Sequence, residues 1–146
     1  MMDTKLVENA VTQSETMISQ LMEAADQLER TIEAETHIRR MLKEAEQALE
    51  NAEAETLYTA EIAAQDKSGP LAGIAKTSAT YKAALTNLLA QARGNDGPMG
   101  ELARQVDNLR VRLDRAQIER EQAAVHFSAC KHAADLKTSV LRAMVL

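Results

Sequence analysis

The stretch that decides the fold is LARQVDNLRVRLDRAQIEREQAAVHFSACKHAADLKTSVLRAM, residues 102–144. Apolar side chains recur in it at alternating steps of three and four residues, which is the spacing of a coiled-coil seam. Only Arg120 and Lys137 interrupt this apolar line. The line consists of Leu102, Val106, Leu109, Leu113, Ala116, Ala123, Phe127, Cys130, Ala134, Leu141 and Met144.

A second apolar row lies on another face of the same predicted helix. Val111, Ile118 and Val125 recur every seven residues and point away from the first line. A helix that is apolar on two sides has neighbours on two sides. We therefore expect these three residues to contact a further helix.

Breakers divide the chain into three helices, which we expect near 3–66, 71–93 and 98–144. Residues 66–70 read DKSGP and residues 94–98 read GNDGP. Glycine and proline are the residues that most often mark where helices end and begin. Helix formers fill the rest, and aromatic residues make up 2% of the chain. We predict an all-α fold with coiled-coil-like packing, in which residues 1–146 form a single elongated helical domain.

The first predicted helix also has an apolar line, whose phase slips by one residue near Glu35. Before the slip the line includes Val11 and Ala25, and after it Ile38, Ala45 and Ala52. Together the two long helices supply the predicted core and oligomer contacts, which are Ile18, Leu21, Leu28, Ile32, Leu42, Leu49, Leu109, Leu113, Phe127 and Leu141.

Helix lengths lead to a prediction of self-association. At about 1.5 Å per residue the three helices span roughly 95, 35 and 70 Å. Short connections make successive helices antiparallel, so the last helix would extend about 35 Å beyond the first corner and about 60 Å of the first helix would stay uncovered. Because the apolar lines continue through these segments, we expect a homodimer or a higher even oligomer.

The only segment that looks like a catalytic motif is KSGPLAGIAKTSATYK, residues 67–82. A phosphate-binding loop needs its second glycine next to the lysine and a strand before the loop, and Gly73 is separated from Lys76 by two residues. We read the segment as a helix corner. A weaker interpretation is an anion site formed by Lys67, Lys76, Thr77, Lys82 and Arg93.

Charge is distributed unevenly along the chain. Residues 1–65 carry 14 acidic and 5 basic side chains, whereas residues 66–146 carry 8 acidic and 12 basic ones. The acidic half could pack on the basic half, or each could face a charged partner. The run RVRLDRAQIERE, residues 110–121, is typical of a salt-bridged helix surface and leaves nucleic-acid binding open as an alternative.

The remaining features favour a cytoplasmic protein that is not an enzyme. Cys130 is the single cysteine, and it lies four residues after His126. That spacing could place two metal ligands on one helix face, but zinc requires more, so we expect a buried cysteine and neither metal nor cofactor. The sequence contains no stretch of about 20 apolar residues, and we expect no membrane contact. The predicted partners are a second copy and an unidentified protein.

Overall fold

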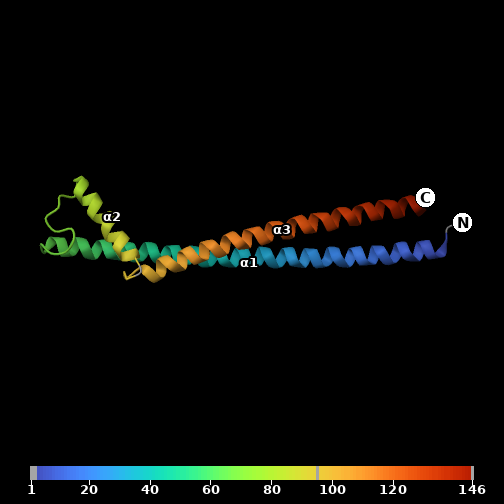
Figure 1. Ribbon diagram of the computed structural model, residues 1–146, viewed down its shortest axis with the longest axis horizontal. Helices are drawn as coiled ribbons and strands as arrows, with labels where there is room; N and C mark the ends of the chain where they lie inside the picture. The colour runs from blue at the N-terminus through green and yellow to red at the C-terminus, as the bar shows by residue number, and fades with distance from the viewer. Residues whose placement is uncertain (1–2, 95, 146) are drawn as a thin grey trace. The chain divides into compact units, whose positions relative to one another are not determined.

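The computed structural model describes residues 3–94 and 96–145, and within them it contains three helices and no strand (Figure 1). Helix α1 spans Thr4–Gln65, α2 spans Ala79–Arg93 and α3 spans Gly100–Val145. The predicted all-α class and the long, short, long order of helices are confirmed. The chain divides into two compact units, of which unit 1 comprises Met1–Ile38 with Leu113–Leu146 and unit 2 comprises Arg39–Arg112. The single-domain organisation stays a prediction.

Segments of α1 and α3 pack antiparallel in unit 1. Arg120 pairs with Glu35, and further along α3 the Lys137 ammonium donates a 2.7 Å hydrogen bond to Gln13. As residue numbers rise on α3 they fall on α1, which defines opposite chain directions. Apart from Ala25, the buried and half-buried residues of α1 in this unit follow steps of three and four, and they are Ala10, Ser14, Met17, Leu21, Ala24, Leu28, Thr31, Glu35 and Ile38.

Buried and half-buried side chains of α3 lie opposite these residues. We call this line of side chains between the two helices the seam. The α3 members in unit 1 keep the spacing expected from the sequence. On α1 the predicted phase slip is wrong, because one uninterrupted repeat passes through Ala24, Thr31 and Glu35. Small side chains such as Ala24 suit the narrow space between two closely packed helices, which a hydrophobicity pattern alone does not reveal.

In unit 2, α2 and the first part of α3 both run opposite to α1. Tyr81 on α2 contacts Glu61, and Arg93 at the end of the same helix pairs with Glu53. Arg110 on α3 then reaches Glu46 at 3.5 Å. The predicted reversal between the second and third helices is therefore wrong, and the third helix continues along α1.

The connection between α2 and α3 explains this direction. Gly94 ends α2 as expected, and its amide donates to the carbonyls of Ala90 and Gln91. The chain then folds back onto the end of α2, where the Met99 amide donates a 2.8 Å bond to the Ala92 carbonyl. Gly97 allows this approach, since a Cβ there would lie 2.3 Å from the Ala92 oxygen. As a result α3 starts beside the end of α2. The helix lengths alone predict that part of the first helix stays uncovered and that the last helix extends past it. The described residues do not show this, because α3 follows α1 as far as the contact of Lys137 with Gln13.

The connection between α1 and α2 is longer than expected, because α2 begins at Ala79 and not near residue 71. Lys67, Gly69 and Gly73 adopt positive φ values of 55°, 84° and 72°, which are incompatible with a continuous helix. Ser78 starts α2 as its N-cap, and its hydroxyl accepts a 3.1 Å bond from the Tyr81 amide.

A small apolar core holds this connection against α1. Leu71, Ala60 and Tyr81 are buried together, and the partly buried residues packed on them are Ala64, Ile74, Ala84, Leu85 and Leu88. Leu71 and Met99 are among the most completely buried side chains of the described residues. Both come from connections and not from helices, so the turns of unit 2 are fixed by apolar burial.

Candidate functional site

The predicted core residues do not share one environment. Ile18 and Ile32 are exposed by 54% and 45%, one position beyond the seam residues Met17 and Thr31. Leu42 and Leu109 are buried in unit 2. The other predicted members are half-buried, which are Leu21, Leu28, Leu49, Leu113, Phe127 and Leu141.

The second apolar row predicted on the last helix is exposed in the chain. Val111 lies in unit 2, whereas Ile118 and Val125 lie in unit 1. None of the three contributes to the seam, which runs through Ala116 and Ala123 on α3. Their contact with a further helix stays a prediction.

One ion pair crosses the seam of unit 1. Arg120, the residue that interrupts the apolar line of α3, pairs with Glu35 on α1. The side chain of Glu35 is 11% exposed and that of Arg120 is 37% exposed, so the pair is shielded mainly at its acidic end. A charged pair inside an apolar seam fixes which residues face each other, because shifting either helix would bury a charge without its partner.

A second polar layer lies further along the same seam. Lys137, the other interruption on α3, donates to the side-chain oxygen of Gln13. The neighbouring Ser14 hydroxyl is buried without a hydrogen-bond partner among the protein atoms. Sequence analysis identified Glu35, Arg120 and Lys137 as interruptions but did not pair them. Glu35 and Arg120 carried the signal, because the polar residue that interrupts one apolar line can be aligned with the polar residue that interrupts the other.

The residues of the predicted anion site come from several parts of unit 2. Lys67 lies just beyond α1, and Lys76 and Thr77 lie in the turns before α2. Lys82 and Arg93 occupy opposite ends of the 15-residue α2, and Arg93 is already paired with Glu53. Lys76 lines a surface hollow together with Glu61 and Tyr81, so a carboxylate accompanies the lysine there. The anion site stays a prediction.

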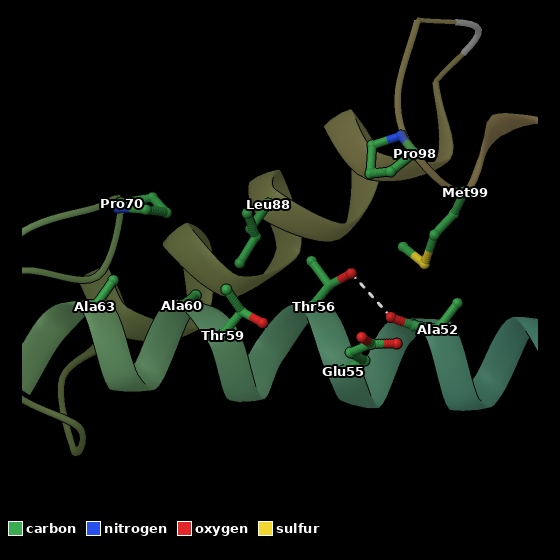
Figure 2. Close-up of a pocket in the computed structure, with 10 residues that line it drawn as sticks. All are labelled: Ala52, Glu55, Thr56, Thr59, Ala60, Ala63, Pro70, Leu88, Pro98 and Met99. Atoms are coloured by element: carbon green, nitrogen blue, oxygen red, sulfur yellow. Dashed lines mark hydrogen bonds between the residues drawn. The ribbon is translucent and has the colours of Figure 1, made fainter.

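Unit 2 contains a hollow of about 560 Å³ between α1, α2 and the two connections (Figure 2). Its walls are mostly alanine, threonine, proline and leucine side chains, and Glu55 is the only ionisable residue among them. The hydroxyl of Thr56 is engaged, since it donates a 2.8 Å bond to the Ala52 carbonyl (Figure 2). The lining is therefore mainly apolar, with two threonine hydroxyls and one carboxylate among its polar groups.

Cys130 is half-buried in the seam, and its Sγ lies 3.7 Å from the Nε2 of His126. Gln20, Glu23 and Gln27 of α1 line the surface beside them. Within the described parts of the chain, no three or more histidine, cysteine, aspartate or glutamate side chains gather to hold a metal ion.

Comparisons of the chain with protein-family models, with curated proteins and with solved structures give no match. Across residues 3–94 and 96–145, no helix combines the length and apolar character needed to cross a membrane.

Proposed function

We propose that this protein is a non-enzymatic, coiled-coil-like helical oligomer that acts as a structural or protein–protein interaction module. One observation carries the proposal. Of the fourteen large apolar side chains that are exposed among the described residues, eleven lie in unit 1, on the outer faces of α1 and α3. Isolated exposed apolar residues are ordinary, but their concentration on two helices is typical of an interaction surface.

The chemistry of one hollow supports a role without catalysis. The 560 Å³ hollow of unit 2 is lined mainly by apolar and hydroxyl side chains, with Glu55 as the only ionisable group in its lining. The charged residues of the seam, Glu35 and Arg120, are engaged with each other. Glu35 and Arg120 thus serve the pairing of the two helices. The outer surfaces of the helices remain for recognition of a partner.

The alternative, nucleic-acid binding through the basic corner 67–93 and the arginine-rich α3, has weaker support. Arg93 and Arg110 both pair with glutamates of α1. Those pairs lower the positive charge available to phosphate groups.

The experiment that tests the proposal measures thermal unfolding by circular dichroism over a hundredfold range of protein concentration. An oligomer that unfolds to separate chains has a melting temperature that rises with concentration. A melting temperature that stays constant contradicts the proposal. In parallel, binding of single-stranded polynucleotide is titrated at several salt concentrations, and a steep loss of affinity with salt would favour the nucleic-acid alternative.

A further inference from the structure

An apolar line runs along α1 beside the seam in unit 1. Each of its members follows a seam residue by one position, and all of them except Met22 recur every seven residues. We call this line, consisting of Val11, Ile18, Met22, Ala25 and Ile32, the flanking stripe. Ala25 is half-buried and the other four are exposed. The stripe extends over 22 residues, or about 30 Å of helix.

Further along α1, beyond the flanking stripe, the equivalent positions carry charged residues. Seven-residue steps from Ile32 lead to Arg39, Glu46 and Glu53. In unit 2, Glu46 pairs with Arg110 of α3 and Glu53 pairs with Arg93 of α2. A charged position beside the seam is typical of a two-helix coiled coil, whereas an apolar one widens the buried face and is typical of helices that pack in larger bundles.

We infer that the flanking stripe binds α1 of a second copy of this chain, in antiparallel orientation. This inference rests on the proposed function and assigns its partner and surface. The pattern of charge along one edge of the stripe identifies the partner. Seven-residue steps along that edge pass through Glu8, Glu15, Met22, Glu29 and Thr36 and reach Lys43. The edge is thus acidic at its start and basic at its end.

Such a pattern is complementary to itself when one copy is reversed. An antiparallel alignment centred near Ala25 brings Lys43 of one copy toward Glu8 of the other, and it places Ile18 of one copy near Ile32 of the other. A parallel alignment instead places each glutamate beside its own counterpart, which is repulsive. The reversed arrangement also has the closed two-fold symmetry of most soluble homodimers.

The first test compares two matched variants by light scattering after size-exclusion chromatography. Ile18→Glu places a charge in the stripe, and Ala129→Glu places the same charge on an exposed position of α3 in the same unit. We expect Ile18→Glu to weaken dimerisation at least about tenfold and Ala129→Glu to leave it within about threefold. Because both side chains are exposed in the chain, helicity by circular dichroism serves as the check that both variants fold.

The second test determines orientation by disulfide formation in a Cys130→Ala background. Thr12 and Arg40 are exposed residues near the two ends of the stripe. Cross-links formed only when Thr12→Cys is mixed with Arg40→Cys support the antiparallel dimer, whereas cross-links of Thr12→Cys alone contradict it. A wild type that remains at 16.0 kDa overturns the proposed function and this inference together. A wild-type dimer that Ile18→Glu does not weaken overturns this inference alone.

Discussion

The ion pair between Glu35 and Arg120 provides the sharpest test of how the seam is aligned. Replacing each residue with alanine, singly and together, gives a double-mutant cycle whose coupling energy isolates the interaction between the two side chains. Exposed pairs typically contribute about 0.2–1 kcal/mol, while breaking a fully buried pair costs about 3–5 kcal/mol. Glu35 is 11% exposed and Arg120 is 37% exposed. We therefore expect a coupling of about 1–2 kcal/mol, between these limits.

The same chain supplies a matched control. Glu46 and Arg110 join α1 to α3 at 3.5 Å, with side chains that are 46% and 59% exposed. Their cycle should give less than about 0.5 kcal/mol. Both cycles are measured by urea unfolding at one fixed protein concentration, because association itself shifts apparent stability. If the coupling of Glu35 with Arg120 does not exceed that of the control pair, the polar layer does not align the seam.

Three further outcomes follow from burial and backbone geometry, each measured by urea unfolding. Met99→Ala should destabilise by about 2–4 kcal/mol because Met99 is buried between the connection and α1, while Leu136→Ala, at an exposed position, should cost less than about 0.5 kcal/mol. Equal effects of the two would show that Met99 is not packed. Ile118→Asp should change stability by less than about 0.5 kcal/mol, since Ile118 is exposed in the chain, and a loss of several kcal/mol would instead show that a partner covers it. Gly69→Ala should cost about 1–2 kcal/mol because φ is 84° and its Cβ would lie 3.2 Å from the Cβ of Ala63, and an unchanged midpoint would contradict this backbone conformation.

The sequence predicts the helices well because their determinants are local. Steps of three and four residues define the seam of α3 over its whole length, and Gly94 ends α2 where expected. The start of α2 is harder to predict. Positive φ values at Lys67 and Gly73 extend the turn region to Ser78, and a lysine in that conformation carries no recognisable sequence signal.

The direction of α3 could not be predicted from the same local signals. Glycine and proline show where a helix ends, but the path of the chain afterwards depends on contacts such as the bond from the Met99 amide to the Ala92 carbonyl. The prediction of the seam residues of α1 was wrong for a related reason. Ile18 and Ile32 are more hydrophobic than Ala24 and Thr31, yet the smaller side chains occupy the narrow space between the helices. Apolar character alone could not separate the seam from the surface beside it.

The central claim, that this protein is an oligomeric interaction module, is tested most directly by sedimentation equilibrium of the wild-type chain between 1 and 100 micromolar, approximate limits that span the usual affinities of such assemblies. We predict a mass that rises to about twice the 16.0 kDa of one chain, or to a higher even multiple of it. A folded protein that keeps the mass of a single chain at every concentration would contradict the claim.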